Sequence, residues 1–176
     1  QRDEPLETDW HPFDLRGHKR DESGEIRDDV DDGKDEGYFE RVRENVTRLA
    51  EKYDAEIDLD ATPETDSWGA QQAALYVREE HPEQFEAFDD ALFEAFWVDH
   101  RDIGDEAVIV EVAESVGLDG ERLRDVLHDD EWAEKLDAEF EEARQRGVTG
   151  VPTFAYDNHA ARGAVPPEQL ERLVEG

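Results

Sequence analysis

Several features that identify common protein classes are missing from this sequence of 176 residues. It contains no cysteine, which excludes disulfide bonds, thiolate metal sites and thiol catalysis from these residues. No run of about 18 apolar residues occurs, so no segment has the composition of a membrane-spanning helix, and no signal peptide is recognisable. Methionine is also absent, even at position 1, and we therefore expect Gln1 to be a processed terminus or the start of a fragment.

Basic residues are scarce. The chain has 19 lysines and arginines against 51 acidic residues, which gives a net charge of -32. Binding to phosphate groups requires clustered basic residues, so this composition argues against nucleic acids and anionic membranes as partners. The acidic residues alternate with large apolar residues at regular intervals, which is not the pattern of a disordered acidic tail.

A large acidic excess spread over a folded domain suits a salt-rich cytoplasm. Exposed carboxylates repel one another in dilute buffer, whereas at about 1 M salt the Debye length falls to about 3 Å and the repulsion is largely screened. The composition therefore predicts a cytoplasmic protein of a halophilic archaeon.

Between residues 35 and 146 the apolar residues recur every three or four positions, which predicts a series of amphipathic helices. Asp35 is a suitable cap for the first helix. The apolar stripe of that helix consists of Phe39, Val42, Val46, Leu49 and Tyr53. Further helices are expected over about 67–80, 85–98, 103–117, around 123–127, and over 131–146.

The two ends of the chain carry the predicted strands. Leu6–Trp10 alternates apolar and polar residues, which predicts a strand with one buried face. Near the C-terminus, Gly147 stands where a left-handed glycine commonly ends a helix. A strand over Val151–Tyr156, a turn at Asp157-Asn158 and a second strand ending with Arg162-Gly163-Ala164 are expected to form a hairpin. A last helix is expected to open with Pro166-Pro167-Glu168.

Residues 16–34 form a polar segment that contains three glycines and is predicted to be a loop. A loop of this length either lies over a site or is mobile. His11 and His18 have no third histidine or cysteine nearby, so we interpret them as surface residues and expect no metal site.

The sequence Thr149-Gly150-Val151-Pro152-Thr153-Phe154, followed by the hairpin and the last helix, resembles the C-terminal half of a thioredoxin-fold domain. It is similar in particular to the DsbA-like, FrnE-type disulfide oxidoreductases. The resemblance implies an α/β thioredoxin fold with a large all-helical insertion. Residues 1–34 and 147–176 would form the thioredoxin-like domain, and 35–146 the insertion.

The same resemblance implies the site residues. In this superfamily the Val-Pro bond is cis, and the backbone of the residue before proline pairs with the substrate chain. Carried over, Val151 offers its backbone to the substrate and Pro152 holds the loop, while Thr149 and Gly150 shape it. The family layout also places His11 and Phe13 near this site.

Asp9–Leu15 looks like the strand that follows the first active-site helix of the FrnE-type proteins. We therefore expect a first strand and a Cys-x-x-Cys helix before Gln1, and no catalytic residue in the chain as given. The resemblance implies a thiol–disulfide oxidoreductase that has no bound cofactor and acts on proteins or small molecules with thiols or disulfides. It leaves the oligomeric state open.

Two other interpretations remain open. Hydroxychromene-carboxylate isomerases and kappa-class glutathione transferases have a similar layout, and in that case the chain would bind glutathione. For such a ligand, Asp66-Ser67-Trp68 stands at a predicted helix start, where backbone N–H groups can receive an anion, although a plain N-terminal cap is the simpler interpretation. The third interpretation is a non-catalytic binding module that uses an exposed Trp97 and the loop 16–34.

The acidic composition gives a first testable prediction. The melting temperature of the chain should rise between low and molar KCl, because salt screens the repulsion among its carboxylates. Thermal unfolding followed by circular dichroism over a series of KCl concentrations measures this. A melting temperature that does not change with salt would contradict the prediction.

Overall fold

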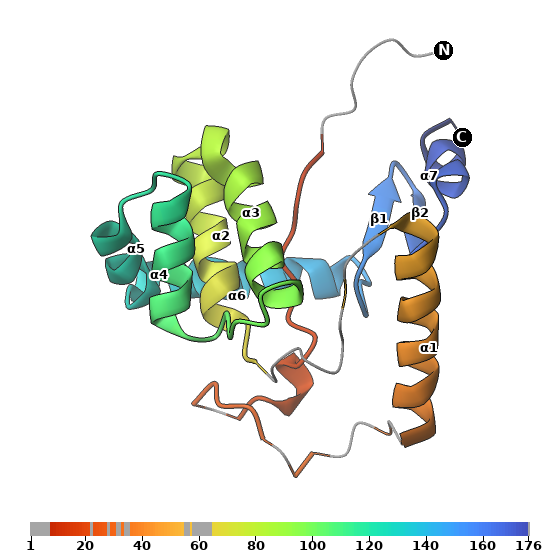
Figure 1. Cartoon of the computed structure of the whole chain (residues 1–176), viewed down its shortest axis with the longest axis horizontal. Helices are drawn as coiled ribbons and strands as arrows, with labels where there is room; N and C mark the ends of the chain where they lie inside the picture. Colours follow the sequence, from red (N-terminus) through yellow and green to blue (C-terminus); the bar gives the residue numbers. More distant parts are fainter. Residues whose placement is uncertain are drawn as a thin grey trace. The chain divides into compact units, whose positions relative to one another are not determined.

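The computed structural model describes residues 8–21, 23–27, 29–30, 33, 36–54, 57 and 65–175 (Figure 1). The described parts of Gln1–His18 and Lys135–Gly176 form one compact unit, and those of Lys19–Glu134 form another. Among the described residues, no helix combines the length and the apolar composition needed to cross a membrane.

Most of the predicted helices are confirmed, with ends that differ by a few residues. The predicted cap Asp35 lies outside the described residues. The order of elements is η1 (Gly17–Lys19), α1 (Glu36–Tyr53), α2 (Trp68–Glu80), α3 (Pro82–Trp97), α4 (Glu106–Ser115), α5 (Gly120–Leu127), α6 (Asp130–Gln145), β1 (Thr153–Tyr156), β2 (His159–Arg162) and α7 (Pro167–Glu175).

The core of the second unit lies among four short helices. Helix α2 packs against α3, α4 and α5. Helix α4 also packs against both α3 and α5, as Figure 1 shows. The small side chains of Ala70 and Ala73 on α2 are buried, which lets the neighbouring helices approach closely. The largest fully buried side chains of this core are Phe88, Ile109, Leu123, Val77 and Val126.

Local sequence explains where these helices begin and end. Asp105 and Asp119 accept hydrogen bonds from backbone N–H groups at the starts of α4 and α5. Pro82 is the first residue of α3, a position where its missing N–H costs nothing. Gly117 has a φ of +84° just beyond α4, as a terminating glycine requires.

The C-terminal strands form the predicted hairpin. β1 and β2 are antiparallel, with Thr153 opposite Arg162 and Tyr156 opposite His159, and α7 packs against both strands. Asp157 occupies the first turn position with a φ of +52°. β1 begins at Thr153 rather than at Val151, because proline at position 152 has no N–H for the ladder.

The predicted N-terminal strand is wrong where it can be checked. Leu6 lies outside the described residues, and Thr8–Trp10 adopts no strand. The sheet of the described residues consists of β1 and β2 alone, so no strand near residue 8 pairs with the hairpin. Alternation alone does not make a strand, because the backbone groups need a neighbouring strand to complete the ladder. Trp10 is accordingly 57% exposed.

The loop 16–34 has local structure in its described part. Arg20 and Ile26 form an isolated β-bridge, and the Asp21 carboxylate accepts hydrogen bonds from Ser23. These hydrogen bonds, from the Ser23 side chain first, lower the pKa of Asp21. Trp97 is not the exposed residue that we expected: it is half-buried, with its ring edge-on to Phe96 at 4.8 Å between centroids.

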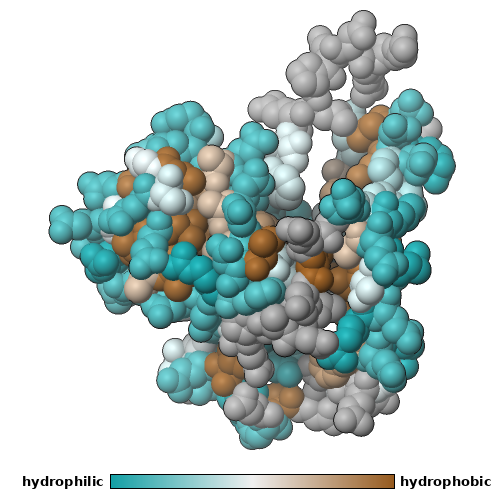
Figure 2. Space-filling model, in the orientation of Figure 1, coloured by the Kyte–Doolittle hydropathy of each residue, from teal (hydrophilic) through white to brown (hydrophobic). Residues whose placement is uncertain are grey.

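The surface carries the acidic excess. Figure 2 shows that hydrophilic residues cover most of the visible face of helices α2–α5, with smaller apolar patches between them. Where carboxylates crowd a partly buried position, ionisation is disfavoured: burial raises the pKa of Asp89, and the charge of Asp90 adds to the shift. An acid whose pKa is raised by folding lowers the stability of the fold at pH values above its usual range, where the unfolded chain ionises freely.

His100 gives a prediction about stability. It has a φ of +54°, and its Nδ1 is a buried side-chain atom with no hydrogen-bond partner in the described chain. An L-residue in the left-handed region costs about 1–2 kcal/mol, which glycine avoids. His100→Gly should therefore raise the free energy of unfolding by about 1 kcal/mol in urea titrations.

His100→Ala is the matched control. It also removes the unpaired imidazole nitrogen but keeps the Cβ atom at a positive φ, so it should gain less than His100→Gly. Equal stabilities for the two variants would mean that the backbone conformation at residue 100 carries no cost.

Candidate functional site

The site begins where α6 ends. The N–H of Val148 donates to the carbonyl of Ala143 at 3.0 Å, and the N–H of Gly147 donates to that of Arg144 at 2.9 Å. Gly147 has a φ of +80°. This is the Schellman pattern of helix termination, and it confirms the predicted role of Gly147. The chain leaves the helix here and enters the loop that precedes β1.

The loop is held at several points. The hydroxyl of Thr153 donates to the carbonyl of Gly150 at 2.6 Å, and the N–H of Gly163 donates to the carbonyl of Pro152 at 2.8 Å. Arg162 Nη2 also donates to the carbonyl of Gly147 at 3.0 Å. Gly147 at the start of the loop and Pro152 at its end are therefore both hydrogen-bonded to residues at the end of β2 or directly after it. The peptide bond between Val151 and Pro152 is cis, the isomer that the resemblance implies.

Val151 is the open position of the loop. Its side chain belongs to the exposed apolar residues, at 48% exposure. Within the described chain, neither its backbone N–H nor its carbonyl makes a hydrogen bond. A free N–H and carbonyl on an anchored loop can pair with an extended peptide in the manner of an added strand. Thr149 and Pro152 are also exposed, whereas Gly150 is half-buried.

His11, another predicted site residue, contacts α6. His11 Nδ1 is 2.8 Å from Glu139 Oε2, and its Nε2 is 3.1 Å from Asp9 Oδ2. Glu139 lies about 9 Å along the helix axis from Gln145, the last residue of α6, at 1.5 Å a residue. The hydrogen bonds of His11 thus attach it to α6 and to Asp9 rather than to the loop, and Phe13 is half-buried.

Sequence reasoning missed Asp14, which is only 9% exposed in this acidic chain. Its Oδ1 accepts the N–H of Arg16 at 2.9 Å, and its carbonyl accepts the N–H of Gly17. The carboxylate stabilises the turn that leads into η1. The signal in the sequence was weak, because one aspartate among so many acidic residues carries little information.

Asp66-Ser67-Trp68, the alternative anion site, lies at the start of α2. The Asp66 carboxylate itself accepts the N–H of Trp68 at 3.1 Å, and both of its oxygens pair with Arg20 at 2.7 and 2.8 Å. A carboxylate therefore already occupies the helix N-terminus. The plain capping interpretation explains this position, although the cap comes from Asp66 rather than from Ser67.

Comparison with known proteins places this geometry in context. Residues 1–175 match the family described as DSBA-like thioredoxin domain. Over 173 residues the chain is 24% identical to the uncharacterized protein YwbO of Bacillus subtilis (strain 168), and the alignment covers 96% of this chain and 81% of that protein.

Two crystal structures share the fold. A candidate protein disulfide isomerase from Nitrosomonas europaea superposes with a TM-score of 0.67 at 19% identity, over 80% of this chain and 73% of that one. A candidate DsbA oxidoreductase from Streptomyces coelicolor superposes with a TM-score of 0.69 at 26% identity, over 80% of this chain. The chain spans only 60% of the Streptomyces protein.

The helix end predicts the effect of two glycine substitutions. A Cβ atom at Gly147 would meet no atom within 4 Å, so its positive φ is the only obstacle to a side chain. Gly147→Ala should lower the free energy of unfolding by about 1 kcal/mol, because alanine resists the left-handed conformation. Urea titration of the purified chain measures this.

Gly150→Ala is the control for this substitution. Gly150 also has open space at the Cβ position, but its φ lies outside the left-handed region, so the change should be within about 0.5 kcal/mol. An equal loss in both variants would show that the helix end does not depend on the conformation of Gly147.

Proposed function

The chain belongs to the family of DSBA-like thioredoxin domains, and we propose that its full gene product is a thiol–disulfide oxidoreductase of the FrnE type. Its fold is the α/β thioredoxin fold of that family, with a helical insertion. The observation that carries the proposal is the anchored loop at Val151, an exposed residue whose backbone groups make no hydrogen bond within the described chain. We place the protein in the salt-rich cytoplasm of a halophilic archaeon on the basis of its net charge of -32.

The chemistry requires thiols that these residues do not contain. The proposal assigns them to a Cys-x-x-Cys segment elsewhere in the full gene product. A thiolate of that pair attacks one sulfur of a substrate disulfide, and the substrate's other sulfur leaves as a thiolate. The second cysteine then displaces the substrate from the mixed disulfide. The substrate gains two electrons and two protons, and the enzyme pair becomes a disulfide.

The part that this chain plays is to position the substrate. A disulfide sulfur reacts only when it lies in line with the attacking thiolate, so the substrate backbone must be held. The N–H of Val151 donates to a substrate carbonyl and its carbonyl accepts a substrate N–H, as in an antiparallel pair. Backbone pairing of this kind does not depend on the substrate side chains. It also avoids the surface carboxylates, which would repel acidic substrates.

Glutathione-dependent isomerisation or transfer is the second candidate, because glutathione has a peptide backbone that the same loop would bind. The two candidates differ in the segment that carries the reactive residue, where Cys-x-x-Cys indicates the oxidoreductase and serine in place of the first cysteine indicates the glutathione-using class. A non-catalytic role would leave both activities absent. Assays of the full gene product with a dithiol peptide and with glutathione separate the three cases.

The loop gives a direct test of the proposal. Val151→Pro in the full gene product removes the backbone N–H at this position, whereas Val151→Ala keeps it. Loss of one hydrogen bond costs about 1 kcal/mol, so kcat/KM for reduction of insulin should fall about fivefold in Val151→Pro. Val151→Ala should stay close to the unchanged protein. The 176-residue chain itself should show no turnover.

Circular dichroism and melting temperatures establish that both variants are folded. Equal activities in Val151→Pro and Val151→Ala would remove Val151 from the substrate site. A full gene product that contains Cys-x-x-Cys and neither reduces insulin nor oxidises a dithiol peptide would overturn the proposed function itself.

A further inference from the structure

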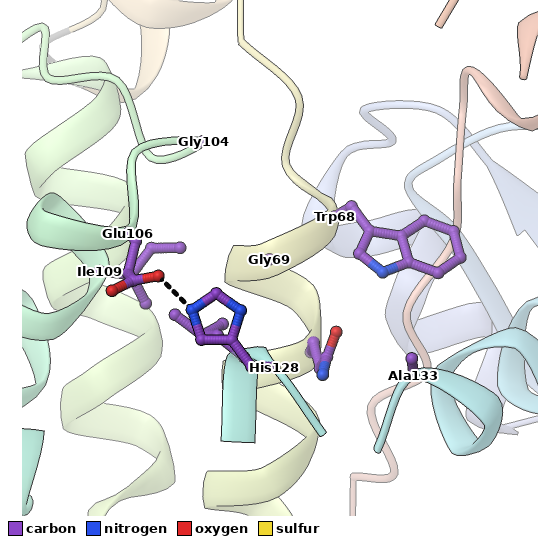
Figure 3. Close-up of a pocket in the computed structure, with 9 residues that line it drawn as sticks. Trp68, Gly69, Gly104, Glu106, Ile109, His128 and Ala133 are labelled. Atoms are coloured by element: carbon purple, nitrogen blue, oxygen red, sulfur yellow. Dashed lines mark hydrogen bonds and ion pairs between the residues drawn. The ribbon is translucent and has the colours of Figure 1, made fainter. Parts of the chain in front are cut away.

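A pocket of about 310 Å³ lies within the unit Lys19–Glu134, among the starts of α2 and α4, the end of α5 and the first turn of α6 (Figure 3). Its volume is at the lower end of the range for small-molecule sites. Gln72 and Ile109, which are 2% and 1% exposed, line its buried part. In Figure 3, Trp68 stands on one side and the pair Glu106 and His128 on the other.

Gln72 supplies a buried acceptor. Its Nε2 donates to the carbonyl of Val126 at 2.7 Å and lies 3.4 Å from that of Asp129. These contacts fix which amide atom is the nitrogen. The opposite orientation would place Oε1 next to two carbonyl oxygens, to which it cannot donate a hydrogen bond. Oε1 has no hydrogen-bond partner in the described chain. Among the described residues His100 Nδ1 is the sealed side-chain atom without a partner, so Oε1 of Gln72 keeps some accessible surface, and Gln72 is one of the residues that line the pocket.

Glu106 supplies a second acceptor, and this one is charged. Its Oε1 is 3.0 Å from Arg124 Nε, and its Oε2 is 2.7 Å from His128 Nε2. These contacts hold the carboxylate at the rim of the pocket. Each carboxylate oxygen has two lone pairs, so each can accept one more hydrogen bond.

Trp68 supplies an aromatic surface that is held in position. The guanidinium of Arg20 lies 4.8 Å from the centre of the indole ring and pairs with both oxygens of Asp66. The Arg20 side chain is only 11% exposed, which limits its movement and therefore that of the ring. A flat apolar group can pack against this ring and against Ile109 and Leu127.

The electrostatics disfavour an anion. Helix starts attract anions, but the starts of α2, α4 and α6 are already capped by carboxylates. Asp66, Asp105 and Asp129 accept first-turn N–H groups there at 3.1, 2.8 and 2.9 Å. None of the nine described residues that line the pocket is a lysine or an arginine.

We propose that this pocket binds a small organic cation, an ammonium or amidinium group on a flat apolar body. The cationic group donates to Glu106 and to Oε1 of Gln72, and the body packs against Trp68. Two buried or rim acceptors, one of them charged, together with an aromatic wall are the features that recognise such a ligand.

Benzamidine and benzamide provide the test, since they have nearly the same shape and differ in charge. Isothermal titration of the 176-residue chain in one buffer of fixed KCl concentration should give a dissociation constant at least about tenfold lower for benzamidine. Equal affinities, or no binding of benzamidine at millimolar concentration, would overturn the proposal.

Three variants locate the binding. Glu106→Gln should abolish most of the difference between the two compounds, and Gln72→Met should weaken benzamidine several-fold. Glu111→Gln is the control, because Glu111 lies on the same helix and also pairs with an arginine, Arg101, but does not line the pocket. Circular dichroism shows whether each variant is folded. An unchanged ratio of affinities in folded Glu106→Gln would place the cation elsewhere.

A free metabolite and the side chain of a docked protein can present the same group. Acetyl-arginine amide, titrated beside benzamidine, distinguishes these sources. Tighter binding of benzamidine assigns the pocket to free aromatic cations, and tighter binding of the arginine derivative assigns it to basic side chains.

Discussion

The end of α6 is the constraint on which the loop at Val151, the proposed substrate site, depends. Gly147 turns the chain out of the helix in a left-handed conformation, and two hydrogen bonds back into the last turn fix the direction in which it leaves. The loop is then fastened to β2 through Gly163 and Arg162. A helix on one side and a hairpin on the other therefore hold Val151 in place while its own backbone groups stay unpaired. Such a loop can bind a substrate chain without first being ordered, which lowers the entropic cost of binding.

The acidic surface and the buried core have different physical roles. The charges lie mostly on exposed positions, where each contributes little to stability in a favourable pair and repels its neighbours when unpaired. The core of the helical unit is built from alanines on α2 and from larger side chains such as Phe88 and Leu123 on the surrounding helices. Both proposed sites suit ligands that an acidic surface does not repel. The loop offers neutral backbone groups, and the pocket offers acceptors that suit a cation, so neither requires an anion to approach this surface.

Secondary structure could be predicted from the sequence where the interactions that determine it act between residues close together in the chain. The helices and the hairpin followed from apolar spacing, from Pro82 and Gly117, and from the turn at Asp157, because each acts within a few residues. The strand predicted over Leu6–Trp10 is absent from its described part, Thr8–Trp10, because pairing depends on distant residues that alternation does not reveal. Two sets of contacts could not be predicted because they join residues far apart in the sequence. His11 contacts Glu139, and Arg20 contacts both Asp66 and Trp68.

The sequence by itself determined the class of the protein, the position of the loop at Val151 and Pro152, and the absence of a thiol from these residues. These are properties of composition and of a short continuous motif. Only the tertiary structure decided that the backbone of Val151 is unpaired, that Asp66 rather than Ser67 caps α2, and that Gln72, Glu106 and Trp68 line one pocket. Those outcomes depend on which side chains fill the remaining space and hydrogen-bonding capacity around each group, which is fixed only when the helices pack.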